Sequence, residues 1–349
     1  SGRISARLPN ELVRKGSVNV EVEAAANGLF GIPLPEAGYS NVSEGSLWVF
    51  AEAALALVDE EAWDLYHDLY VPSEYLRLAP DIKKLDPWRG HILSRLNELV
   101  NAVDLGDRST WKRAKPILTE LYRHRNASFT HEVSAVGHAH IDTGWLWPVA
   151  ETVRKCARTF SSATTYMERY PSYRFACSQA VQFEMMKERY PGLYGRIKAA
   201  VKRGQFIPVG GSWVEPDCNV PSGESLVRQF LYGKRYFRRE LGVDCKEFWN
   251  PDVFGYTGAL PQILREVGIE HFVTQKLSWN QFNKPIHMNF WWQGIDGSRV
   301  LTHFPPSDTY NAMAGHNAVR DLIHHVDNNA DNDRTNQGLL LFGYGDGGG

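Results

Sequence analysis

Two histidines, an aspartate and a tryptophan close an apolar run near the middle of the chain. The run leads into His138, His140 and Asp142, and Trp145 follows. Side chains of an extended strand alternate between its faces, so the first three are expected on one side. Imidazole and carboxylate groups together suit a divalent metal such as zinc. The alternative is a polar strand end whose histidines bond to backbone groups, and the repeated spacing favours the metal.

Three further carboxylates stand in short motifs rich in glycine and aromatic residues. They are Asp217, Asp252 and Asp346. Each one alone is also typical of a turn or of a helix N-cap. Together with the metal strand and the tryptophans, they indicate hydrolysis of a glycoside by paired carboxylates. The final segment Gly343–Gly349 lacks the Lys-Ser/Thr of a P-loop, so it does not indicate a nucleotide site.

The elements that must position these groups alternate between strand and helix. This alternation predicts an α/β fold, a parallel sheet with crossover helices that is either open or closed into a barrel. Ligands bind at the carboxyl ends of strands in such folds, and these strands end in polar or aromatic residues, so one polar pocket is expected. We predict strands at 133–136, 173–177, 205–209, 271–275, 288–293, 299–304 and 338–342, and helices at 151–169, 182–202, 223–240 and 258–267.

The residues before this region have a different pattern. An alternating segment at Ser17–Ala24 is typical of an antiparallel strand, and it predicts a β domain that begins before residue 1. Helices are expected at Leu47–Tyr70, from Asp86 onward and at Trp111–Arg125. The chain therefore reads as an internal piece of a longer polypeptide. The expected parts are 1–40 (end of a β domain and a linker), 41–131 (helical linker region) and 132–349 (α/β barrel catalytic domain, truncated at its C-terminal side).

Composition narrows the class of protein. Hydrophobic residues make up 43% and charged residues 22% of the 349 residues, which is enough for a large packed core. The net charge of −2 argues against nucleic acid as the main partner. No apolar run is long enough for insertion into a membrane. The four cysteines match no metal or disulfide pattern, which favours a reducing compartment.

Several of these segments resemble one known family. Gly137–Pro148, Asn250–Tyr256 and Phe342–Gly349 are similar to glycoside hydrolase family 38, in particular to its cytosolic and vacuolar class II α-mannosidases. The resemblance implies a distorted seven-stranded (β/α) barrel, preceded by a helical linker and the end of a β domain. It also implies a retaining exo-α-mannosidase that acts on terminal α-mannosides of free, N-glycan-type oligosaccharides. The expected location is cytoplasmic, or vacuolar in a fungus.

The resemblance also implies roles for individual residues. His140 and Asp142 correspond to metal ligands, and Asp252 to a residue that is both ligand and nucleophile. Asp346 is then the acid/base. The remaining positions are expected to bind the sugar: Trp145, Phe254, Asp217 and Lys276. One divalent ion is implied, zinc or cobalt.

The ligand set implied by the resemblance differs from the set predicted from the alternation of side chains along the strand. His138 corresponds to a motif residue that is not a ligand, and a further ligating histidine is expected beyond Gly349. The expected partners are an oligosaccharide, the C-terminal part of the same polypeptide and other copies of the chain in a homo-oligomer. Two other functions remain open: another metal-dependent barrel hydrolase, such as an amidohydrolase or a polysaccharide deacetylase, and a non-catalytic carbohydrate-binding protein.

Overall fold

The computed structural model describes residues 8, 10–15, 18–20, 54–78, 80, 86–123, 131–312 and 317–346. The chain divides into two units, Ser1–Ala56 and Leu57–Gly349. In the first unit the described residues include the helix α1 (Asn10–Arg14). The strand expected at Ser17–Ala24 lies largely outside the described residues, and its described part, 18–20, has no regular structure. Most of the expected linker before residue 41 also lies outside them.

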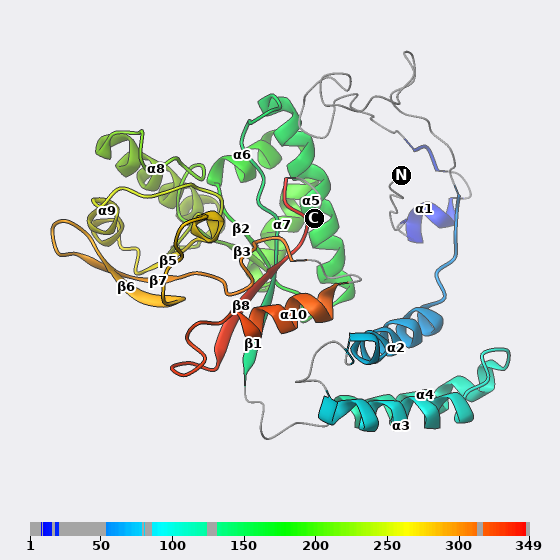
Figure 1. Ribbon diagram of the computed structural model, residues 1–349. Helices are drawn as coiled ribbons and strands as arrows, with labels where there is room; N and C mark the ends of the chain where they lie inside the picture. Colours follow the sequence, from blue (N-terminus) through cyan, green and yellow to red (C-terminus); the bar gives the residue numbers. More distant parts are fainter. Residues whose placement is uncertain are drawn as a thin grey trace, which may run out of the picture. The chain divides into compact units, whose positions relative to one another are not determined.

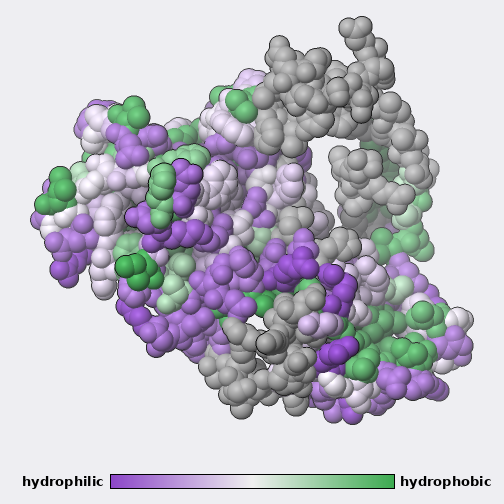
Figure 2. All heavy atoms as spheres, in the orientation of Figure 1, coloured by the Kyte–Doolittle hydropathy of each residue, from purple (hydrophilic) through white to green (hydrophobic). Residues whose placement is uncertain are grey.

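The second unit begins with helices that pack on one another (Figure 1). They are α2 (Glu60–Leu78), α3 (Asp86–Ala102), the 3-10 helix η2 (Arg108–Arg113) and α4 (Ala114–Arg123). Partly buried residues of α2 pack against one cluster of buried apolar side chains from α3 and α4: Ile92, Leu99, Ala114, Ile117, Leu118 and Leu121. Figure 2 shows other hydrophobic side chains of this region on the surface.

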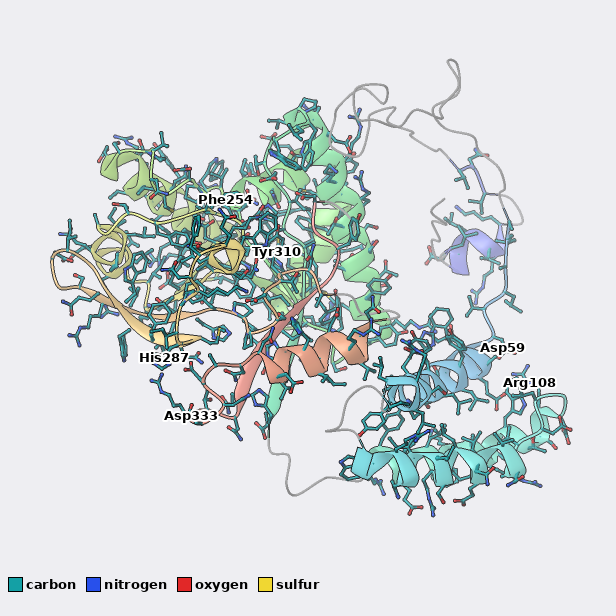
Figure 3. All side chains as sticks on the ribbon, viewed as in Figure 1. Asp59, Arg108, Phe254, His287, Tyr310 and Asp333 are labelled. Atoms are coloured by element: carbon teal, nitrogen blue, oxygen red, sulfur yellow. The ribbon has the colours of Figure 1, made fainter. Side chains whose placement is uncertain are left out.

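The first of these helices does not span the expected residues. Residues 54–59 are not helical, and α2 runs from Glu60 to Leu78. The Asp59 carboxylate accepts a hydrogen bond from the Ala62 amide at 3.1 Å, which is the contact of an N-cap. Asp59 also pairs with Arg108 of η2 at 2.7 Å, and Figure 3 shows the two residues close together. The predicted helix at Leu47–Tyr70 was therefore wrong for its described first part, and residues 47–53 lie outside the description.

The rest of the unit is a mixed α/β structure built on two four-stranded sheets. The first sheet is entirely parallel and has the order β3-β2-β1-β8. In the second sheet, of order β4-β5-β7-β6, only β6 runs antiparallel to its neighbour. The strands are β1 (Glu132–His138), β2 (Phe175–Cys177), β3 (Phe206–Pro208), β4 (Glu247–Trp249), β5 (His271–Val273), β6 (Asn289–Gln293), β7 (Arg299–His303) and β8 (Gln337–Phe342).

Side chains from both sheets share a central core. Ala176 and Leu341 of the first sheet pack with Trp249 and Val273 of the second, and Tyr310 joins them. Two outer cores hold the helices against the sheets. One packs α5, α6 and α7 on β2 and β3, and the other packs α8 and α9 on β4, β5 and β7 (Figure 1). The expected α/β class is confirmed. The seven-stranded closed barrel stays a prediction, because pairing among the described strands joins neither sheet to the other.

The helices of this part differ from the expected ranges mainly where the chain bends. The expected helix at 182–202 is two helices, because Pro191 cannot continue the hydrogen bonding of the first and instead begins the second. The helix α10 was not expected from the sequence. The bounds are α5 (Val149–Arg169), α6 (Ala180–Arg189), α7 (Pro191–Lys202), α8 (Gly223–Tyr236) with a π turn at Phe237–Leu241, α9 (Leu260–Glu266) and α10 (Ala318–Asp327).

The four cysteines are free thiols and are all buried. Their exposed fractions are 0% for Cys156 and Cys218, 1% for Cys177 and 2% for Cys245. Burial is also the main reason why the pKa of each thiol is raised. Within the described part of the chain, no helix is both long and apolar enough to cross a bilayer.

Candidate active site

The two histidines of the opening motif have different surroundings. His138 is the last residue of β1 and is completely buried. Its Nε2 accepts a hydrogen bond from the Trp249 indole at 2.9 Å, and its Nδ1 lies 3.3 Å from the Tyr310 carbonyl oxygen. Burial lowers the pKa of His138 to about 3, so the ring is neutral and both nitrogens are engaged. The strand ends here, and strict alternation therefore does not extend to His140 and Asp142.

His140 instead faces carboxylates on both sides of its ring. Its Nδ1 lies 2.8 Å from Glu215 Oε2. Its Nε2 lies 3.4 Å from Asp142 Oδ1 and 3.2 Å from Asp252 Oδ2. Burial alone would lower the pKa of this imidazole, but the three carboxylates raise it well above its usual value. The buried Nε2 has no geometrically adequate hydrogen bond among the described residues, so this atom is oriented toward oxygen ligands and remains unsatisfied.

Asp252 reaches the same place from the loop after β4. The Lys276 amine donates a hydrogen bond to Asp252 Oδ1, while Oδ2 lies beside His140. Burial raises the pKa of this carboxyl, and the two cationic neighbours more than offset that effect, so the net shift is downward. The sequence places Asp252 more than 100 residues after His140. The parallel arrangement of the strands brings the two side chains together.

Asp346 completes the group from the turn after β8. The Asp346 amide donates a hydrogen bond to the His140 carbonyl oxygen at 2.5 Å, and Lys155 Nζ donates one to the Asp346 carbonyl oxygen at 2.7 Å. Its backbone has a positive φ of 57°. Carboxyl oxygen Oδ1 is buried and has no hydrogen-bond partner among the described residues. Burial, together with the charges of Asp142 and Asp252, raises the pKa of Asp346, which favours a protonated carboxyl.

These side chains form a cluster that fits a divalent cation. Ligand atoms of His140, Asp142 and Asp346 all lie within 4.8 Å of one another. Asp252 approaches the same imidazole nitrogen. An unsatisfied buried Nε2 beside several carboxylate oxygens is the donor set that zinc and similar ions bind. The structure thus brings all four residues of the expected metal and acid/base set together. The compact group contains the expected acid/base Asp346 with His140 and Asp142, whereas the expected ligand Asp252 lies next to it, beside His140 Nε2.

Aromatic side chains stand beside the cluster. Phe254 and Trp279 meet edge to face, with ring centroids 6.2 Å apart. Both are largely exposed, at 73% and 65%. Lys276 Nζ lies over both rings and over Tyr310, and Figure 3 shows Phe254 and Tyr310 in the same part of the molecule. Trp145 is 52% exposed, so its ring is also accessible to a ligand.

Asp217 has a clear local role. Its Oδ1 accepts hydrogen bonds from the amides of Asn219 and Val220, both at 2.8 Å, which is the pattern of an Asx turn. The side chain is on the surface. This contact matches the turn interpretation that the sequence left open, and the binding of sugar by Asp217 stays a prediction.

Two residues of the site, Ser178 and Glu215, were expected only as polar residues that follow strands, and a third, Tyr310, was not expected at all. Glu215 contacts His140, Ser178 contacts Glu215, and Tyr310 lies between His138, His140 and Asp252. Ser178 and Glu215 do follow predicted strands, and that position was a usable signal. Tyr310 lies in a loop with no distinctive pattern, so nothing in the sequence marked it.

The amino-acid sequence that forms this site matches a known family. Residues 130–349 match the profile described as the Glycosyl hydrolases family 38 N-terminal domain. The chain belongs to glycosyl hydrolase family 38. It is 45% identical over 341 residues to alpha-mannosidase 2C1 of Homo sapiens, covering 95% of this chain and 31% of that protein. It is 38% identical to an alpha-mannosidase of Saccharomyces cerevisiae, covering 94% of this chain and 31% of that protein.

A solved structure has a similar fold. An alpha-mannosidase from Enterococcus faecalis V583 superposes with a TM-score of 0.51 at 20% identity, over 62% of this chain and 25% of that one. At that identity the likeness concerns the fold alone. The chain spans about a third of the length of the family 38 relatives named above.

Proposed function

We propose that the chain carries the catalytic site of a metal-dependent, retaining exo-α-mannosidase that acts on free N-glycan-type oligosaccharides. The observation that carries the proposal is that Asp252 and Asp346 meet beside one buried imidazole, His140, whose Nε2 has no hydrogen bond within the described part of the chain. The pKa of Asp252 is lowered and the pKa of Asp346 is raised. A nucleophile must be ionised and a general acid must hold a proton, so the two environments suit the two roles. The family membership and the α-mannosidase names of the relatives support the choice of substrate.

His140, Asp142 and Asp252 would hold the divalent ion, zinc or cobalt. When bound, that ion would anchor hydroxyl groups of a terminal mannose and favour a distorted ring. Trp145 and Phe254 offer exposed ring faces on which a sugar can stack. Lys276 keeps Asp252 ionised and limits its rotation through the hydrogen bond to Oδ1.

The chemistry then proceeds in two displacements. Asp252 attacks C1 of the mannose, and the bond from C1 to the glycosidic oxygen breaks. Asp346 gives its proton to that leaving oxygen. Asp346 next takes a proton from water, whose oxygen attacks C1 and releases Asp252. Two inversions at C1 give net retention of configuration.

Trapping the intermediate tests the nucleophile. The complete natural polypeptide is incubated with a fluorinated mannosyl analogue that carries a good leaving group, and its peptides are analysed by mass spectrometry. We expect one mannosyl adduct on Asp252 and none in Asp252→Asn. If Asp252→Ala kept full activity and no adduct formed, a hydrolase that uses metal-bound water would replace this proposal.

Azide rescue tests the acid/base. Asp346→Ala should hydrolyse an aryl mannoside with a good leaving group slowly, because deglycosylation lacks its base. Added azide should restore turnover and give α-mannosyl azide, identified by NMR. Absence of rescue, with wild-type activity in the variant, would show that Asp346 is not the acid/base.

A further inference from the structure

Glu215 is tied down at both carboxylate oxygens. It lies in the loop after β3, where Oε2 is 2.8 Å from His140 Nδ1 and Oε1 accepts a hydrogen bond from the Ser178 hydroxyl at 2.5 Å. The side chain is only 3% exposed. Ser178, in the loop after β2, is buried as well. The loops that follow three adjacent strands of one sheet are thus joined through this carboxylate.

These contacts exclude a direct part in the chemistry. Each oxygen of Glu215 is already engaged, and a sugar hydroxyl does not reach a side chain that is 3% exposed. Any effect of Glu215 on the reaction therefore passes through His140.

The contact determines what His140 can offer. A hydrogen bond from Nδ1–H to a carboxylate fixes the tautomer and the ring plane, and it leaves the lone pair on Nε2. That Nε2 is the atom that faces Asp142 and Asp252 and has no adequate hydrogen bond. His138 shows the contrast, since its Nε2 already accepts a hydrogen bond from Trp249.

We propose that Glu215, supported by Ser178, is the positioning residue that makes His140 a metal ligand and distinguishes it from His138. The inference rests on the proposed function, because it assumes a metal at the cluster. Glu215 makes the imidazole more basic and holds its ring in place. Outer partners of this kind typically change metal affinity by about 10- to 100-fold.

Metal affinity, measured apart from catalysis, tests this role. Dissociation constants for Co²⁺ and Zn²⁺ are measured in the complete polypeptide by competition with a chelating dye, and the visible spectrum of bound Co²⁺ is recorded. We expect Glu215→Ala to weaken binding by about 10- to 100-fold. Glu215→Gln should lose less, because the amide oxygen can still accept from Nδ1–H. Excess metal should recover much of the lost kcat, which would not happen after a general structural defect.

Glu247→Gln is the matched control. Glu247 is also partly buried, but it lies at the opposite end of its strand, at the start of β4. Its metal affinity should equal that of the wild type. If Glu215→Ala does not fold, Glu215→Gln and Ser178→Ala replace it, and both should weaken binding.

The outcomes separate this inference from the proposed function. A folded Glu215→Ala variant, or Ser178→Ala where Glu215→Ala does not fold, that binds Co²⁺ within threefold of the wild type would overturn the inference and leave the mannosidase proposal intact. A wild-type polypeptide that binds no divalent metal, yet hydrolyses mannosides, would overturn both the inference and the metal dependence.

Discussion

Lys276 is a buried cation held between a carboxylate and three aromatic rings. Its amine hydrogen-bonds to Asp252, and it lies 3.3 Å from the centroid of the Trp279 ring and 4.7 Å from that of Phe254. The resemblance assigned Lys276 to the sugar site. The structure adds a more immediate partner, the proposed nucleophile, and so gives the lysine an electrostatic role.

Replacing this lysine should alter the pH dependence of the reaction. In Lys276→Met, Asp252 loses a cation that lowers its pKa, so that pKa rises toward the usual range. The acidic limb of the kcat/KM profile should then move to higher pH. Breaking the buried pair should also cost about 3 kcal/mol of stability. The measurements are a pH–rate profile and a urea unfolding curve.

Lys284→Met is the control for this experiment. Lys284 pairs with Asp308 at 2.6 Å, and half of its side chain is exposed. Its loss should change neither the pH profile nor the stability by more than about 0.5 kcal/mol. An unchanged acidic limb in Lys276→Met would contradict the role assigned to the lysine.

At the scale of secondary-structure elements, the end of β8 depends on a close backbone approach. Gly343 has a φ of 140°, and a Cβ added there would lie 2.0 Å from the His138 carbonyl oxygen. That contact packs the turn carrying Asp346 against the end of β1. A side chain at Gly343 therefore has no room unless one of the two strand ends moves.

Gly343→Ala should consequently displace Asp346 from the cluster. We expect a loss of about 2 to 4 kcal/mol in the free energy of unfolding, together with a large fall in kcat. Gly195→Ala in α7 is the matched control, because its Cβ would meet nothing within 4 Å. That change should stabilise the protein by about 1 kcal/mol. Equal stability of the two variants, measured by thermal unfolding, would contradict the close approach.

The elements could be predicted from sequence to different degrees. The long amphipathic helix α5 and the strand β8 have strong local patterns, and both were expected nearly as found. The helix α10 was missed, since its short apolar pattern lies among histidines and asparagines. The antiparallel direction of β6 was not expected either, because it depends on pairing with β7.

The site was predictable for a different reason. His140, Asp142, Asp252 and Asp346 were expected because long motifs match a family. Local physics alone would have grouped His138 with them. The position of Glu215 after a strand placed it near the pocket, but its role beside His140 could not be predicted, since that role depends on a contact between two loops that no spacing in the sequence records.

At the scale of the molecule, three histidines outside the active-site cluster, His131, His303 and His325, lie close to one another. His325 on α10 is fully buried, and neither ring nitrogen has a hydrogen-bond partner among the described residues. His131 and His303 are close enough to affect its charge. Burial lowers the pKa of both His325 and His303 to about 4.

This group should make the fold sensitive to acid. The unfolded chain binds protons at these histidines below about pH 6.5, whereas the folded chain does so only near pH 4. Above about pH 6.5 these neutral histidines therefore do not reduce the free energy of unfolding, which falls as the pH drops toward 4. His303 and His325 each contribute about 3 kcal/mol to this loss.

His325→Leu should make thermal stability less dependent on pH between 7 and 4.5. Its melting temperature should be lower than that of the wild type at pH 7, because the packing is altered, and closer to it at pH 4.5. If the melting temperature changed with pH equally in the two proteins, His325 would not be held neutral by the fold.

The four buried thiols allow the rate of local unfolding to be measured in each core. Cys156, Cys177 and Cys245 belong to the core beneath α5, α6 and α7, whereas Cys218 belongs to the core beneath α8 and α9. A thiol-reactive reagent should label none of them rapidly in the native protein, and each labelling rate should report the local unfolding of its own core. Mass spectrometry of the four peptides would then reveal whether the two helical layers detach together or one after the other.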